Sequence, residues 1–61
     1  MEITDLQARS IRRKQADKNK TSSEIAREIG ISPITYRNVK NGANVRISTY
    51  KKIMEWLTED L

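Results

Sequence analysis

The two glycines of this chain, Gly30 and Gly42, constrain its fold more than any other feature, because each follows a short segment that opens with a helix-capping residue. The run Thr21-Ser22-Ser23-Glu24 has the form of a capping box, so a helix starts there, and Gly30 ends it in the left-handed conformation. Ser32 and Pro33 then supply the N-cap and first residue of a second helix, which ends near the second glycine. The sequence therefore predicts two short helices, 22–29 and 33–41, joined by three residues.

The apolar residues of this stretch are spaced as two crossing helices require. Helices that meet at a steep angle through a short turn need a small residue where their backbones approach, and apolar residues that fasten both to the rest of the protein. Ala26 is the small residue, and Gly30 is the turn glycine. The fastening residues are Ile25, Ile29, Ile31, Tyr36 and Val39.

A helix is predicted on each side of this pair. Residues Ile3–Lys18 contain no Gly or Pro, and a thin apolar stripe recurs at helical spacing: Ile3, Leu6 or Gln7, Ser10 or Ile11, and Lys14. We expect the charged positions of this helix to form a mostly solvated face, made of Arg9, Arg12, Arg13, Lys14 and Lys18.

The last helix is predicted from the cap candidate Ser48 onward, with Tyr50, Ile53, Met54, Leu57 and Leu61 on one face. Trp56 lies off that stripe, so it either covers the flank of the core or faces a partner. Together the segments predict an all-α fold, a compact bundle of four or five short helices in a single domain spanning residues 1–61.

Composition excludes several functional classes. The chain has no Cys and no His, which removes disulfides, the common zinc sites and His- or Cys-dependent catalysis, and we expect no enzyme, cofactor, metal or small-molecule ligand. Residues 1–46 carry 10 basic and 5 acidic residues, within a net charge of +4 for the whole chain. This excess of basic residues predicts attraction to a polyanion. No apolar run approaches the roughly 20 residues of a membrane span, so we expect a cytoplasmic protein.

Residues 21–42, TSSEIAREIGISPITYRNVKNG, resemble the helix-turn-helix regulators of the lambda-repressor and Cro type, also called the xenobiotic-response-element family. The resemblance implies that the second helix of the motif enters the DNA major groove while the first lies across the backbone. The chain departs from the family's usual pattern at three positions: Ser22 replaces a Gln, Lys20 replaces a Leu, and Lys14 replaces an apolar residue.

The resemblance also implies which residues touch DNA. Arg37 pairs bidentately with guanine, Asn38 pairs with adenine, and Ile34 or the Thr35 methyl packs on a thymine methyl. The base-reading candidates are Pro33, Ile34, Thr35, Arg37 and Asn38. The phosphate candidates, which lie near helix ends or in the following loop, are Lys20, Thr21, Ser22, Ser32, Lys40, Asn41 and Arg46.

The resemblance favours a Cro-like phage repressor that binds a pseudo-palindromic operator as a homodimer, because one recognition helix reads only a few base pairs. Candidates for the dimer contact are Trp56, Leu57 and Leu61. A second hypothesis is an antitoxin-like module that binds a protein partner with the same fold. Its contact residues would be Trp56, Glu55, Glu59 and Asp60.

Overall fold

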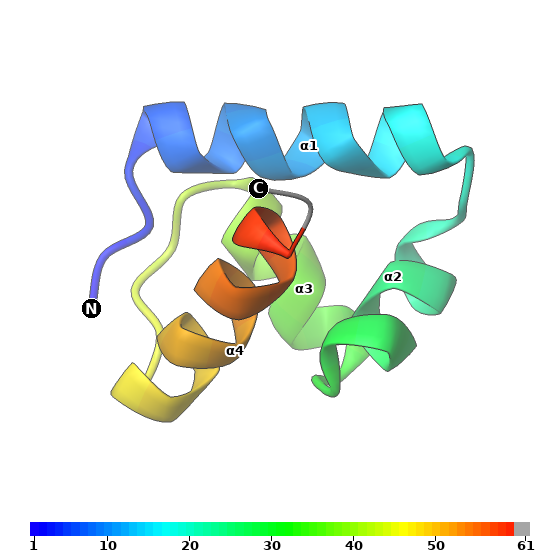
Figure 1. The fold of residues 1–61 in the computed structure, drawn as a ribbon. Coiled ribbons are helices and arrows are strands. Elements are labelled where there is room, and N and C mark those ends of the chain that lie inside the picture. The colour runs from blue at the N-terminus through cyan, green and yellow to red at the C-terminus, as the bar shows by residue number, and fades with distance from the viewer. Residues whose placement is uncertain (60–61) are drawn as a thin grey trace.

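The computed structural model describes residues 1–59 and contains four helices within them: α1 (Asp5–Lys18), α2 (Ser22–Ile29), α3 (Pro33–Lys40) and α4 (Ile47–Thr58). Figure 1 shows α1 lying along one side of the molecule, with the other three helices grouped beneath it. The all-α prediction is confirmed, and a fifth helix is absent from the described residues. None of these four helices is long and apolar enough to cross a lipid bilayer.

The start of α1 differs from the prediction. Thr4 caps the helix: its hydroxyl accepts from the Gln7 amide at 3.1 Å, and the Gln7 side chain accepts from the Thr4 amide at 3.0 Å. Ile3 therefore precedes the helix, although it is buried as expected. Of the two alternatives for the second position of the apolar stripe, Leu6 is 71% exposed and Gln7 is half-buried, and the neighbouring Ala8 is buried.

The boundaries of α2 and α3 follow the predicted local chemistry. Thr21 and Glu24 form the reciprocal capping box, with both hydrogen bonds at 3.2 Å. Gly30 ends α2 with φ of 94°, a conformation that costs a residue with a side chain more than it costs glycine. Ser32 caps α3 ahead of Pro33, and that helix ends at Lys40, one residue earlier than predicted.

The start of α4 corrects a second boundary. Ser48 is not its cap: the helix begins at Ile47, Arg46 occupies the N-cap position, and no side chain makes a capping hydrogen bond there. The position is fixed instead by a pairing between the N-terminal segment and the loop that follows α3. The Val45 amide donates to the Met1 carbonyl at 2.8 Å, and the Ile3 amide donates to the Ala43 carbonyl at 3.3 Å.

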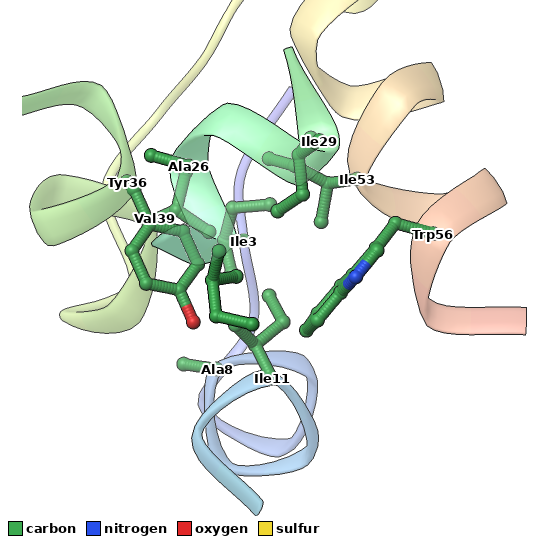
Figure 2. Packing of buried hydrophobic residues seen from close by; sticks show 10 residues of the cluster. Ile3, Ala8, Ile11, Ala26, Ile29, Tyr36, Val39, Ile53 and Trp56 are labelled. Carbon is green, nitrogen blue, oxygen red and sulfur yellow. The ribbon is translucent and has the colours of Figure 1, made fainter. Parts of the chain in front are cut away.

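The core draws residues from all four helices, together with Ile3 from the N-terminal segment. Figure 2 shows Ile29 of α2 beside Ile53 of α4 at one end of the cluster, Ile11 of α1 at the other, and Tyr36 of α3 along one side. Ile31, Val45, Tyr50, Met54 and Leu57 pack against this cluster from its edge. All the predicted fastening residues are therefore in the core or against it.

Trp56 belongs to the core and not to a partner surface. Its side chain is only 4% exposed, and Figure 2 shows its ring reaching from α4 toward Ile11. The indole N–H donates to a carboxylate oxygen of Glu28 at 3.2 Å, so its polar atom is satisfied within the chain. Of the two alternatives the sequence left open, the structure shows that Trp56 covers the core, which corrects its assignment to a dimer contact.

Candidate nucleic-acid interface

The outer face of α3, defined here as Ile34, Arg37 and Asn38, is the side of that helix that faces away from the core. All three residues are exposed, whereas Tyr36 and Val39 on the inner side are buried. At about 100° per residue, Ile34 lies about 160° around the helix from Tyr36 and about 140° from Val39. Ile34 is therefore near the centre of the outer face, and Arg37 and Asn38 lie on either side of it.

The first turn of α3 is held by two hydrogen bonds between Ser32 and Thr35. The Ser32 hydroxyl accepts from the Thr35 amide at 3.1 Å and donates to the Thr35 hydroxyl at 2.8 Å. Thr35 is half-buried, unlike the other four base-reading candidates, which are all exposed. Its side chain therefore serves the helix start, which leaves Pro33, Ile34, Arg37 and Asn38 as the base-reading candidates with open side chains.

A hollow of about 420 Å³ borders the outer face of α3 on the side of α4. Asn38 opens onto it from α3, while Arg46 and Asn44 come from the loop before α4. Thr35, Val45 and Thr49 complete its lining. No local sequence signal marked Asn44 or Thr49 as a candidate. Their positions depend on the pairing of residues 1–3 with residues 43–45, which joins segments far apart in the chain.

On the other flank of α3, two of the phosphate candidates are in direct contact. The Lys40 ammonium donates to the Ser22 hydroxyl at 2.7 Å, and the Gln15 side-chain amide donates to the same oxygen at 3.3 Å. A hydroxyl has two acceptor positions and one proton. Because both acceptor positions are used, the Ser22 proton is the group that remains to donate to a ligand.

Gln15 of α1 connects this flank to the core. Its carbonyl oxygen accepts from the Tyr36 hydroxyl at 2.8 Å, while its amide also donates to the Lys20 carbonyl at 3.2 Å. Burial raises the pKa of Tyr36 to about 12, so the phenol keeps its proton for this bond. Arg12 donates to the Lys40 carbonyl at the end of α3. The sequence did not predict that Gln15 and Arg12 contact α3, because these contacts join helices that are far apart in the chain.

The remaining phosphate candidates are exposed at helix ends. Lys20 and Thr21 precede α2, Asn41 follows α3, and Arg46 precedes α4, while Ser32 is the α3 cap. Lys20 also pairs with Glu28 at 3.1 Å, so its charge is partly offset within the chain. Lys40 differs from this group because it is half-buried, with its ammonium 5.4 Å from the centre of the Tyr36 ring.

A second cluster of charges lies around Trp56, and we call it the Trp56 cluster: Lys14, Lys18, Glu28, Trp56 and Glu59. Glu28 pairs with Lys18 at 3.0 Å, and Lys18 reaches Glu59 at 3.6 Å. Hydrogen bonds from Lys18 and then Lys20 lower the pKa of Glu28 to about 2. The cluster ties together α1, α2 and the end of α4.

Lys14 departs from the mostly solvated face expected for the charged positions of α1, although Arg9, Arg12 and Arg13 are exposed as expected. Only 11% of its side chain is exposed, because its ammonium lies 4.7 Å from the centre of the Trp56 ring and pairs with Glu59 at 3.4 Å. It also donates to the Trp56 carbonyl near the end of α4. A lysine thus fills the place where an apolar residue was expected, covering the tryptophan with its stem and the helix end with its charge.

The partner surface proposed for an antitoxin-like module loses its aromatic residue, because Trp56 is buried. Of the dimer candidates, Leu57 is half-buried against the core, and Leu61 lies outside the described residues, as does Asp60.

In comparisons with known proteins, no protein-family model, no curated protein and no solved structure matched this chain. The family resemblance of residues 21–42 therefore stays a prediction.

Proposed function

We propose that this protein is a sequence-specific regulator of transcription that binds double-stranded DNA through a helix-turn-helix, and that it acts as a Cro-like repressor in the bacterial cytoplasm. In this proposal α2 and α3 are the two helices of the motif. Helix α3 enters the major groove, and α2 lies against the backbone.

The observation that carries the proposal is the outer face of α3. Within residues 1–59, the side chains of Arg37 and Asn38 make no hydrogen bond or ion pair to the protein, although each offers several donors. A guanidinium and a carboxamide on one exposed helix face match the edges of guanine and adenine in the major groove. The helix that carries them is anchored by the buried Tyr36 and Val39, so the polar pair is presented on a rigid support.

The flanks of α3 supply the groups that DNA phosphates require. The Ser22 hydroxyl and the Lys40 ammonium lie together on one flank, and Arg46 lines the hollow on the other. Phosphate contacts of this kind fix the register of a protein on DNA without reading its sequence. Lys40 and Arg46 therefore place a cation on each side of α3, as contact with the phosphates on both sides of the major groove requires.

We further propose that the protein acts on DNA as a homodimer. One outer face reads only a few base pairs, whereas two faces related by a two-fold axis read half-sites about 34 Å apart. The operator is then a pseudo-palindrome. Bound there, the dimer excludes polymerase or a competing regulator.

The test is selection of bound sequences from random duplex DNA, followed by titration of the selected duplex and a scrambled duplex of equal length over a salt series. We expect one sequence to be enriched and to bind more tightly than the scrambled duplex at each salt concentration. Both affinities should fall as salt rises, since bound cations release counterions from the phosphates. Weak, equal binding to both duplexes would reject the proposal.

A matched pair of lysine variants sharpens the test. Lys40→Met removes a cation from the flank of α3 and should reduce the slope of log affinity against log salt by about 0.9, equally on both duplexes. Lys51→Met removes an exposed cation from α4 and should leave the slope unchanged. Equal slopes for both variants would remove Lys40 from the interface.

A further inference from the structure

We propose that Ile34 recognises the C5-methyl group of a thymine, so that the protein distinguishes thymine from uracil at one position of each half-site. This inference rests on the proposed function and names the apolar part of what the outer face of α3 reads. It also decides between Ile34 and Thr35, which the sequence left as alternatives.

Exposure is the first reason. Ile34 is 74% exposed, the highest value among the large hydrophobic residues of the described part of the chain, and it lies at the centre of the outer face of α3. The local structure gives no reason for an isoleucine at this position, because a β-branched side chain lowers helix propensity and makes no packing contacts where it is exposed. An apolar group presented in this way gains free energy only when a ligand covers it.

The surroundings of Ile34 identify the ligand. Arg37 and Asn38 flank it one turn along the helix, so a partner that covers the isoleucine must also satisfy a cation and a carboxamide. A protein surface with an apolar patch would bury both polar groups at a cost. The major groove meets all three demands, because the thymine methyl is the apolar group that it displays between hydrogen-bonding base edges.

The contacts of Thr35 favour Ile34 over it for this role. Its hydroxyl accepts from Ser32, its amide donates to the same residue, and its side chain is half-buried along the hollow near α4. Around the helix it lies about 100° from Ile34, toward the inner side. The Ile34 side chain is therefore the apolar group at the centre of the face.

Helix geometry places the thymine close to the bases read by the polar pair. Side chains three or four residues apart on a helix have Cβ atoms about 5–6 Å apart, whereas successive base pairs rise about 3.4 Å. One turn of α3 thus corresponds to fewer than two base pairs. We expect the thymine read by Ile34 within two base pairs of those read by Arg37 and Asn38.

The experiment replaces each thymine of the selected duplex, one at a time, with deoxyuridine, which lacks only the C5-methyl group. We expect one position in each half-site to lose affinity about fourfold, the equivalent of about 0.8 kcal/mol for burying one methyl group. 5-Bromouracil, whose bromine is close to a methyl group in size, should restore binding at that position.

Three variants assign the effect to a residue. Ile34→Ala should bind thymine and uracil duplexes equally at that position. Thr35→Ser, which deletes the other candidate methyl, and Leu6→Ala, which truncates an apolar residue on α1 that is 71% exposed, should both keep the fourfold ratio. Circular dichroism should show the same helix content in all three, since each change is made at a half-buried or exposed position.

The inference is overturned if no thymine is sensitive to deoxyuridine, if the ratio persists in Ile34→Ala, or if it disappears in Thr35→Ser. These results differ from failure of the proposed function, in which the selection enriches no sequence and there is no duplex to modify.

Discussion

The outer face of α3 and the Trp56 cluster differ in whether their polar side chains have partners within the chain. In the Trp56 cluster, the indole N–H, the Lys14 ammonium and the Glu28 carboxylate all have partners within the chain. On the outer face of α3, the side chains of Arg37 and Asn38 have none among the described residues. The polar groups of the Trp56 cluster stabilise the fold, whereas the side chains of Arg37 and Asn38 remain available to a ligand.

This difference teaches where stability and binding reside in a small chain. A domain of 61 residues is expected to have a free energy of unfolding of roughly 3–9 kcal/mol, at 0.05–0.15 kcal/mol per residue. Such a chain cannot lose many core contacts and stay folded. Residues on the outer face of α3, by contrast, can be replaced without touching the core, so the two regions should respond differently to mutation.

The largest expected effect is that of Trp56→Ala. The substitution removes the largest core side chain and leaves the Glu28 carboxylate and the Lys14 ammonium without their aromatic partner. We expect a loss of about 3–5 kcal/mol in the free energy of unfolding, comparable to the whole stability of the domain. Urea denaturation followed by circular dichroism measures it.

Ile34→Ala is the control, because it truncates an apolar side chain that is exposed and lies outside the core. Its urea midpoint should equal that of the wild type within error, corresponding to a change below about 0.5 kcal/mol. A Trp56→Ala variant that unfolds at the wild-type midpoint would show that the Trp56 cluster does not stabilise the fold.

The next effect is on binding and not on stability. Arg37→Ala and Asn38→Ala should each relax discrimination at one base pair by about 1–3 kcal/mol, while unfolding midpoints stay at the wild-type value. Competition between the selected duplex and single-base variants of it measures the change.

Arg13→Ala serves as the control for charge, since Arg13 is an exposed arginine on α1. It should leave base discrimination intact. If all three variants keep the wild-type preference, the base-reading role of the outer face of α3 is wrong, whatever the overall affinity.

The two regions also differ in how far the sequence predicts them. Thr21, Gly30 and Ser32 were correctly assigned because capping depends on residues three or four apart, and those residues also orient α3. The exposed positions of α3 follow from helical periodicity once Tyr36 and Val39 are assigned to the core. Local rules therefore suffice to expect this face to be exposed.

The Trp56 cluster could not be predicted in the same way. Trp56 lies off the apolar stripe of α4, and its burial depends on Lys14, which is 42 residues earlier in the chain. The start of α4 was missed for a similar reason: no local cap marks Ile47, and the pairing of Val45 with Met1 fixes the loop before it. Contacts between distant segments leave no periodic signal in the sequence.

A smaller effect is expected at Tyr36, on the inner side of α3. Tyr36→Phe keeps the ring but removes the hydroxyl that donates to Gln15 at 2.8 Å, leaving that acceptor without its donor. We expect a loss of about 1 kcal/mol in unfolding free energy, with base discrimination unchanged. Because burial raises the pKa of Tyr36 to about 12, the wild type should also lose stability as pH rises from 10 toward 12, and Tyr36→Phe should lose less.

The smallest effect is the acid response of Glu28. Its pKa is lowered from 4.5 to about 2, so its pairing stabilises the folded state above pH 4.5, and this contribution is lost as pH falls from 4.5 toward 2. Glu28→Gln should flatten that part of the stability profile and cost less than about 1 kcal/mol at pH 7, because the ion pairs are partly exposed to solvent. Glu55→Gln, which removes an exposed glutamate without an ion pair in the described part of the chain, should leave the profile unchanged.

Some acid sensitivity should remain in Glu28→Gln, since the amide and hydroxyl of Thr21 lower the pKa of Glu24 as well. Equal flattening by both variants would mean that overall charge, and not the Trp56 cluster, governs the acid response.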